Sequence, residues 1–428
     1  MLVFHWSLIL CLQASPVEPL NASDSMESMP PKLEVILEEG SKLLIGVQEG
    51  LEDSEWPYEG VYRVRAQESD PVELVKRRSA IPIGYRVGGT SICAQAIFQA
   101  PGFKNQELAV EAIRKAVGFV CSMTTDPRMS PTAYSGGYDV RGWGYIYALR
   151  MLLALRAESC VPEGMEQVVD DVIRWSIAAL DTIEIPQVGG WNYARRGAAD
   201  EASPTSPFMT APALIALYEA RAQGFTVEES MVERALAGLK LCVAPDGYVA
   251  YSARRPTQDD PGQIPGAIGR MVSAESALLL GGVGASERVR LAVDAFLRDW
   301  RALEARRRKT GTHTPPYGVA PYYFFYGFAA AADAIELLPS EERGPLRTRL
   351  ADILMEIREP DGSWNDRIFE RSRAFGTAMT MHALQAPWLP PASQWVPAPE
   401  SATELATPAS PLNEPTVEPA PDLPESSP

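Results

Sequence analysis

The sequence predicts an all-α fold, an (α/α)6 toroid, in which six pairs of helices close into a ring. Charged amphipathic segments alternate along the chain with segments rich in Gly, Ala, Thr and Ser, and turns containing glycine and aromatic residues recur between them. Repetition at this scale indicates one helical hairpin per repeat. Almost no stretch alternates between polar and apolar residues with a period of two, so we expect few strands.

We expect the amphipathic helices to form an outer layer and the small-residue helices an inner barrel, because Gly, Ala and Thr let helices approach closely. The outer helix comes first in each pair. The expected outer and inner helices are residues 31–50 and 91–99, 107–123 and 142–156, 165–183 and 210–222, 230–243 and 267–280, 287–304 and 319–338, and 346–358 and 373–384. An open solenoid is the alternative, but the end pairs lack an obvious polar cap, which favours closure.

The residues of individual segments support these assignments. In the first outer segment, apolar residues follow helical spacing up to Gly50. The segment 107–123 is amphipathic, whereas 142–156 is apolar nearly all round, as in a helix buried on both sides. The last pair repeats this contrast, because 346–358 is charged and amphipathic and 373–384 consists mostly of small residues.

Both ends of the chain differ from this pattern. Residues 1–14 are apolar enough for a signal peptide, so we expect export to the periplasm or the cell exterior, and residues 15–30 form a flexible segment. The toroid then spans residues 31–387. Residues 388–428 are rich in Pro, Ala and Glu and bury too little apolar surface to offset ordering entropy, so we expect a disordered tail.

Composition excludes several classes of partner. The formal net charge of −16 argues against nucleic acid. No segment after the N-terminus is long and apolar enough to predict a transmembrane helix. The sequence spaces four cysteines widely, Cys93, Cys121, Cys160 and Cys242, and does not group them as in a disulfide framework or a metal cluster. We therefore expect them to be buried as small hydrophobic residues.

Three turns resemble those of prenyltransferase and squalene-cyclase repeats, the terpenoid-cyclase and protein-prenyltransferase toroids. They are Asp361-Gly362-Ser363-Trp364, Gly189-Gly190-Trp191 and Asp246-Gly247-Tyr248. The run from Phe375 to Met379 also resembles the inner helix that follows such a turn. The resemblance covers residues 31–387 and implies a toroid of six helix pairs. Glycine supplies the positive φ of a tight turn, and we expect the aromatic ring to pack between adjacent outer helices.

The catalytic residues of these families do not carry over. The Asp-x-Asp-Asp motif with which class II terpene cyclases protonate their substrate is missing from the sequence, and Asp170-Asp171 lacks the third aspartate of a metal-binding Asp-Asp-x-x-Asp. No Asp-x-Cys is present, and Gly376 stands where the zinc-ligand histidine of protein prenyltransferases falls. His382 on the same segment is typical of a packed core residue. We therefore expect no metal and no cofactor.

Arginines recur close to the starts of the inner helices. The ligand-binding candidates among them are Arg86, Arg141, Arg195, Arg270 and Arg371. Helix N-termini carry partial positive charge and free N–H groups, so these arginines predict a cationic mouth suited to a phosphate or a carboxylate. Local pairing with acidic residues in the same loops is the alternative.

Aromatic residues form a second set of candidates. Those expected to line a central cavity are Trp143, Tyr145, Tyr322, Tyr323 and Tyr326. Such a cavity would suit an apolar chain or a sugar ring. The alternative is that the rings fill the barrel axis as core.

Asp139, Glu275 and Asp366 are the weak catalytic candidates, because a glycosidase or lyase of the α/α-barrel type needs two carboxylates that face one cleft. We prefer a toroid without the known catalytic motifs that binds an apolar or anionic small molecule, or a protein partner, at the barrel mouth. The alternative is an enzyme, either of the cyclase and prenyltransferase type with an isoprenoid substrate or a glycosidase or lyase. A binding protein should show a filled or shallow axis, and an enzyme a deep cavity containing an acid with a raised pKa.

Overall fold

The computed structural model describes residues 28–58, 81–252, 261–307, 309, 315–318, 320, 323–366 and 371–397. The predicted signal peptide (1–14), residues 15–27, Tyr322 and the tail from residue 398 lie outside these ranges.

The described part of the chain contains twelve α-helices in six consecutive pairs, so the predicted all-α toroid is confirmed. The outer helices are α1 (Pro31–Gly46), α4 (Glu107–Ser122), α6 (Glu166–Thr182), α8 (Glu229–Lys240), α10 (Ser286–Glu304) and α12 (Ser340–Glu356). The inner helices are α3 (Ile83–Phe98), α5 (Arg141–Ala157), α7 (Pro207–Ala222), α9 (Ile264–Leu280), α11 (Phe324–Ile335) and α13 (Ser372–Gln385).

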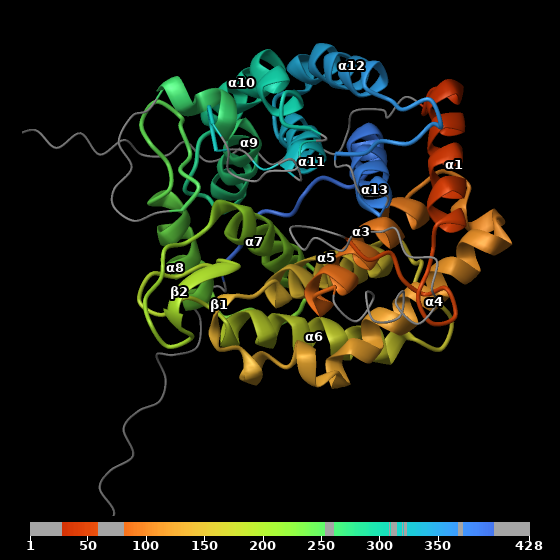
Figure 1. The fold of residues 1–428 in the computed structure, drawn as a ribbon, viewed down its shortest axis with the longest axis horizontal. Coiled ribbons are helices and arrows are strands. Elements are labelled where there is room, and N and C mark those ends of the chain that lie inside the picture. The colour runs from red at the N-terminus through yellow and green to blue at the C-terminus, as the bar shows by residue number, and fades with distance from the viewer. Residues whose placement is uncertain are drawn as a thin grey trace, which may run out of the picture. The chain divides into compact units, whose positions relative to one another are not determined.

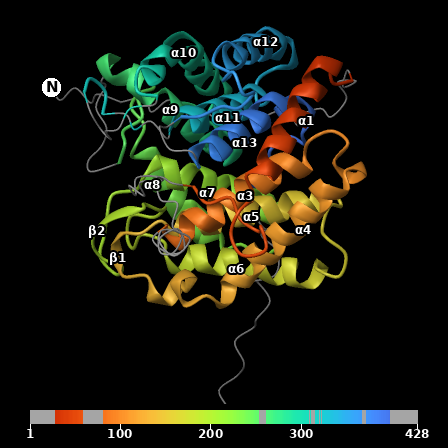
Figure 2. The same ribbon diagram turned by 45° about the vertical axis from the view of Figure 1, so that its right-hand side comes forward.

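The inner helices close into a ring. Each packs on the inner helix of the next pair, and α13 packs back on α3. Each outer helix also packs on the inner helix of the preceding pair, and α1 completes this series by packing on α13. Figure 1 shows α1, α10 and α12 at the periphery with α11 and α13 inside them, and Figure 2 keeps the same arrangement after rotation.

Two ion pairs join the last helix pair to the first. Arg358, just after α12, lies 2.8 Å from Glu39 of α1, and Arg371 at the start of α13 pairs with Glu49. These contacts link residues more than 300 positions apart in the sequence. The ring is therefore closed by side chains as well as by helix packing.

Three of the six turns share one set of hydrogen bonds between a tryptophan and the two helices of its pair, which we call the Trp–Thr tie. The backbone N–H of Trp364 donates to Thr377 Oγ1 of α13 at 3.1 Å, and its indole N–H donates to the Leu354 carbonyl of α12 at 2.8 Å. Trp191 repeats these contacts with Thr210 and Leu180, and Trp56 with Thr90 and Leu44. All three tryptophans and all three threonines are buried.

Glycines make the ties possible in two ways. Gly190 and Gly362, in the turns before Trp191 and Trp364, have φ values of +73° and +85°, as the sequence predicts. On the inner helices, Gly89 and Gly376 precede the tie threonines, and a Cβ at either would lie 2.4 or 2.5 Å from a tryptophan carbonyl oxygen. Gly376, at the expected zinc-ligand position, therefore has a packing role here.

Strands are few in the described residues, as expected. β1 (Gly136–Tyr138) and β2 (Ala194–Ala198) pair antiparallel, with Gly136 opposite Ala198 and Tyr138 opposite Ala194. They lie in the loops that lead into α5 and α7, so they stand at the N-terminal end of the inner barrel (Figure 1).

The structured region continues past residue 387. The backbone N–H of Trp395 donates to the Leu280 carbonyl at the end of α9 at 2.9 Å, and its ring packs on Tyr218. The compact unit that contains the ring ends at Trp395. No helix in the described part of the chain combines the length and the apolar character that a bilayer crossing requires.

Replacement of Thr377 by Val tests the Trp–Thr tie. The substitution keeps the shape but removes the acceptor, so the buried N–H of Trp364 loses its partner, and we expect unfolding free energy to fall by about 1–3 kcal/mol. Urea denaturation measures the change. Thr182→Val on α6 is the control, because Thr182 is exposed and bonds only within its own helix. Equal losses in the two variants would contradict a special role for the tie.

Candidate functional site

A single cavity lies on the axis of the ring, and all six inner helices contribute to its wall. Its volume is about 50 Å³. Most of the wall is apolar, with Ile92, Ile215 and Met379 among the larger side chains, and alanines of α11 and α13 leave the space open. The charged residues Arg150, Asp333 and His382 lie in the C-terminal halves of their helices.

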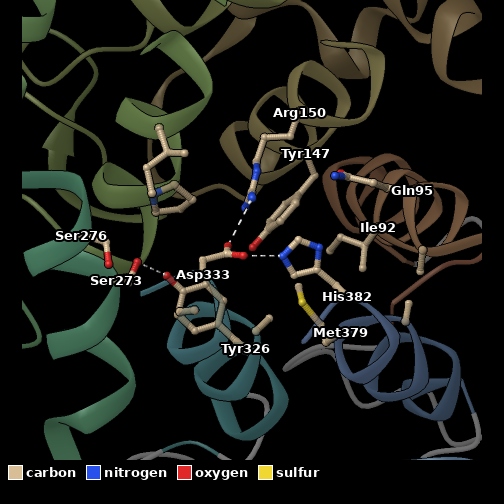
Figure 3. A pocket seen from close by; sticks show the side chains of 16 residues that line it. Ile92, Gln95, Tyr147, Arg150, Ser273, Ser276, Tyr326, Asp333, Met379 and His382 are labelled. Carbon is tan, nitrogen blue, oxygen red and sulfur yellow. Dashed lines mark hydrogen bonds and ion pairs between the residues drawn. The ribbon is translucent and has the colours of Figure 1, made fainter. Parts of the chain in front are cut away.

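Four side chains of this wall form what we call the axial site: Tyr147, Arg150, Asp333 and His382. His382 Nε2 lies 2.7 Å from Asp333 Oδ1, and Arg150 Nη2 lies 3.6 Å from Asp333 Oδ2. The side chains of Arg150 and His382 are each 18% exposed and that of Asp333 is 29% exposed, so the cluster is partly open to solvent. Figure 3 shows the three groups converging from α5, α11 and α13.

Helical periodicity places these side chains. Residues three or four positions apart share a helix face, so Tyr147 and Arg150 project together from α5, and Met379 and His382 together from α13. Tyr326 and Asp333 are seven residues apart, which is two turns of α11, and both line the cavity.

One polar atom of the cavity wall has no hydrogen-bond partner in the described structure. The Tyr147 hydroxyl is buried and unpaired, and Tyr147 as a whole is only 5% exposed. By contrast, the Tyr326 hydroxyl is 2.8 Å from Ser273 Oγ. A buried hydroxyl normally finds a partner, so the Tyr147 hydroxyl is available to a molecule in the cavity.

The charges of the site influence one another. Burial favours the neutral form of Asp333, but His382 and Arg150 outweigh it and hold the pKa of that carboxyl below its usual value. Half-buried Glu219, on α7, interacts with the same groups, yet burial raises its pKa more than Arg150 lowers it. Burial also raises the pKa of Tyr326 to about 12. The site thus contains one firmly ionised acid and one acid biased toward protonation.

Aromatic rings fill the other end of the barrel. This aromatic plug consists of Tyr58, Tyr85, Trp143, Phe208, Tyr251, Tyr323 and Phe375, which lie at or near the N-terminal ends of the inner helices. Phe208 stacks on Tyr323 with ring centroids 3.5 Å apart, and Trp143 contacts Tyr147 at 4.9 Å. Since Tyr147 belongs to the cavity wall, the plug continues directly from the cavity and closes it on this side.

The structure separates the aromatic candidates. Trp143 and Tyr323 are buried in the plug, as the core alternative expects, and Tyr326 lines the cavity. The expectation for Tyr145 is wrong, because its hydroxyl bonds to the Met129 carbonyl and its ring packs on Trp175 of α6. Residues two positions apart point about 200° apart on a helix, so Tyr145 faces outward when Tyr147 faces the axis.

The candidate arginines bind groups of the protein itself, as the local-pairing alternative expects. Arg86 pairs with Glu55 and Arg141 with Asp139, each at 2.6 Å, and Arg371 pairs with Glu49. Arg195 and Arg270 are buried and donate to backbone carbonyls, including those of Ala199 at 3.1 Å and Val249 at 3.0 Å. The arginines of the predicted cationic mouth are therefore partnered within the protein, and Arg141 and Asp139 also line an open groove of about 400 Å³.

Glu275 does not face either of the other two candidate acids, Asp139 and Asp366. Glu275 lies in the second half of α9, away from the helix start, and its carboxylate bonds to Arg288 of α10 at 2.8 Å. It therefore points toward the outer layer, whereas Asp139 is bound to Arg141 before α5. Asp366 is fully buried ahead of α13.

The sequence analysis did not select Arg150, Glu219 or Asp333. Each is a charged residue in a helix that is otherwise apolar or built of small residues, which is the signal that points to them. His382 was interpreted as a packed core residue. In the described residues no group of three or more His, Cys, Asp or Glu side chains is placed to hold a metal ion.

Comparisons with known proteins agree on the fold. No protein family model and no curated protein matches the sequence. The α-1,6-mannanase GH76A of Salegentibacter sp., in an inactive form with α-1,6-mannotriose, superposes with a TM-score of 0.50 at 11% identity, covering 83% of this chain and 99% of the mannanase. The type II terpene cyclase MstE from Scytonema gives 0.45 at 15% identity, covering 84% and 99%, and a polysaccharide lyase gives 0.47 at 12%, covering 83% and 96%. The mannanase shares the α/α-toroid fold with this chain.

Replacement of Asp333 by Asn tests the electrostatics of the axial site. Because the pKa of Asp333 is lowered in the folded protein, its ionised form stabilises the fold above the unfolded pKa of about 3.9, and this stabilisation disappears as pH falls through the folded pKa. We expect a loss on the order of 1–3 kcal/mol at pH 7 that is smaller at pH 3, below the unfolded pKa of about 3.9. Denaturation at both pH values measures it.

Asp171→Asn is the control for this experiment. Asp171 lies on the surface of α6 with its side chain 60% exposed, and it pairs with Arg174, which is 57% exposed, so its loss should be small at either pH. A deficit of Asp333→Asn that is the same at pH 3 and pH 7 would show that packing, and not charge, explains the effect.

Proposed function

We propose that this toroid is a binding protein that takes a small ligand into its axial cavity. The observation that supports the proposal is the cavity, whose volume of about 50 Å³ is closer to the filled or shallow axis expected of a binding protein than to the deep cavity expected of an enzyme. It is bounded by all six inner helices, its charged side chains gather near one end, and an aromatic plug fills the other end. Such a cavity with few polar groups is typical of a ligand site.

The size of the cavity argues for a small ligand. Sites for drug-sized molecules usually measure roughly 300–1,000 Å³, whereas about 50 Å³ holds on the order of three to five waters. An isoprenoid chain of cyclase substrates is too long for this space. The lack of the Asp-x-Asp-Asp and Asp-x-Cys motifs agrees with a role in binding.

Filling the cavity tests this proposal. Ala330 of α11 lines the cavity, so Ala330→Leu should occupy it and weaken binding of small molecules by at least about tenfold. The readout is the methyl NMR signals of Ile92 and Met379 during titration with a mixed set of two- to five-carbon acids, amides, alcohols and amines. These methyl groups report any occupant of the cavity.

Ala351→Leu is the matched control, because Ala351 is also a half-buried helical alanine but lies on outer helix α12. It should leave the titrations unchanged. If no member of the set shifts the methyl signals of the unaltered protein, the axial cavity is not a ligand site.

A glycosidase or lyase is the second candidate function. Asp333 and Glu219 approach the axis from α11 and α7, and their environments push their pKa values in opposite directions. Two such acids can serve as ionised base or nucleophile and as protonated general acid. The mannanase that shares the fold gives α-1,6-mannotriose as a first substrate to try.

Substitution of the two acids tests this second candidate. If the protein cleaves α-1,6-mannotriose or another oligosaccharide, Glu219→Gln and Asp333→Asn should each slow the reaction by about 10²–10⁴-fold. Glu111→Gln, on the exposed face of α4, should retain the full rate. Chromatography of the products measures cleavage. No turnover by the unaltered protein, or full activity of either axial variant, would eliminate this candidate.

A further inference from the structure

The axial site contains more hydrogen-bond donors than the protein satisfies. A guanidinium has five N–H donors, yet the contact described for Arg150 is a single ion pair of 3.6 Å with Asp333. The Tyr147 hydroxyl has no partner within the described structure. Both groups lie on one face of α5 and line the cavity. The site therefore favours a ligand that brings oxygen acceptors.

A carboxylate matches this arrangement. Its two oxygens accept two parallel hydrogen bonds from the N–H groups of one guanidinium. One of the oxygens can also accept a hydrogen bond from the Tyr147 hydroxyl. The rest of the wall, including Ile92, Ile215 and Met379, is apolar and suits a short hydrocarbon chain. The cavity volume of about 50 Å³ limits that chain to a few carbon atoms.

The charges around the site oppose a bare anion. The groups that face the Asp333–His382 pair are Gln95 from α3, Tyr147 and Arg150 from α5, Glu219 from α7, Ser273 and Ser276 from α9, and Tyr326 from α11. Arg150 balances Asp333, which leaves Glu219 and the partial negative charge of the helix C-termini without a compensating cation. The carboxylate of a ligand would therefore be repelled by Asp333 and by Glu219 when Glu219 is ionised.

One proton removes this conflict. His382 Nε2 is 2.7 Å from Asp333 Oδ1, so a protonated imidazole would donate a charge-assisted hydrogen bond to a carboxylate already in place. Imidazole also changes charge between pH 5 and 8. On the basis of the binding function proposed above, we infer that the axial site binds a small monocarboxylate together with one proton, which His382 holds against Asp333.

The inference has a thermodynamic consequence. Ligand, proton and site combine without any covalent change, and the charge of the site remains as it was before binding. Because the complex contains one more proton than the free protein and ligand, affinity must fall as pH rises. Where the free site does not hold the proton, uptake of one proton makes the expected decrease about tenfold per pH unit.

Calorimetric titration of the full chain with propionate and butyrate tests the inference. Titration at pH 8 in two buffers with different ionisation enthalpies gives the number of protons taken up, and we expect a value near one. Titrations from pH 7 to pH 9 should show the tenfold decrease per unit. Arg150→Gln should weaken binding by about tenfold or more, because the bidentate contact is lost.

Two further variants locate the proton. His382→Gln should reduce proton uptake to near zero and flatten the pH dependence. Glu219→Gln should retain both, so loss of uptake in this variant would place the proton on Glu219 and overturn the assignment to His382. Binding of propionate without proton uptake by the unaltered protein would overturn the coupling.

Comparison ligands separate this inference from the proposed function. If propionamide or propanol shifts the Ile92 and Met379 methyl signals and propionate does not, the cavity binds small molecules but the carboxylate class is wrong. If inorganic phosphate binds more tightly than propionate, the apolar wall does not contribute to ligand selection, and the monocarboxylate class of ligand is again wrong. If no ligand of either kind shifts these signals, the proposed function fails as well.

Discussion

The hydrogen bond between the backbone N–H of Trp364 and the Thr377 hydroxyl, repeated at two other turns, fixes the register of an inner helix against its outer partner. The position of the axial residues depends on this register. His382 follows Thr377 by five residues, which is about 140° around the helix. A helix that keeps Thr377 toward its turn therefore directs His382 toward the axis, where Asp333 meets it. The same bonds that define the repeat thus also orient the polar site.

The axis combines two environments that are usually kept apart. At one end, aromatic rings pack against each other, and tyrosine hydroxyls such as those of Tyr251 and Tyr323 bond to one another. At the other end, charged groups from four inner helices share one small space, and each is tolerated because a partner of opposite charge or some solvent is near. The partial exposure of this end allows exchange with solvent, whereas the aromatic end gives the ring its rigid core. Charged groups and packed aromatic rings are therefore separated along the length of the barrel.

Much of the fold could be predicted from the sequence, because the contrast between charged outer segments and small-residue inner segments is strong in every pair. The site could not. The sequence predicts that the first inner helix begins at residue 91, whereas α3 begins at Ile83, so Arg86 lies within the helix and not in the loop before it. Asp333 and His382 are 49 residues apart on consecutive inner helices, and only the packing of α11 on α13 shows that they touch. Periodicity gives the face of one helix, but it does not give which faces of different helices meet.

Ring closure by the final helix also determines when the site comes into being during synthesis. The hairpins from α1 to α12 can form as the chain leaves the ribosome, since each uses neighbours already made. The barrel remains an open arc until α13 emerges and inserts between α11 and α3. A nascent chain that stops before residue 371 would contain Arg150 and Asp333. It would lack α13, which is the last inner helix of the barrel, and with it His382 of the axial site. The axial site is therefore complete only after α13 has been synthesised and has packed between α11 and α3.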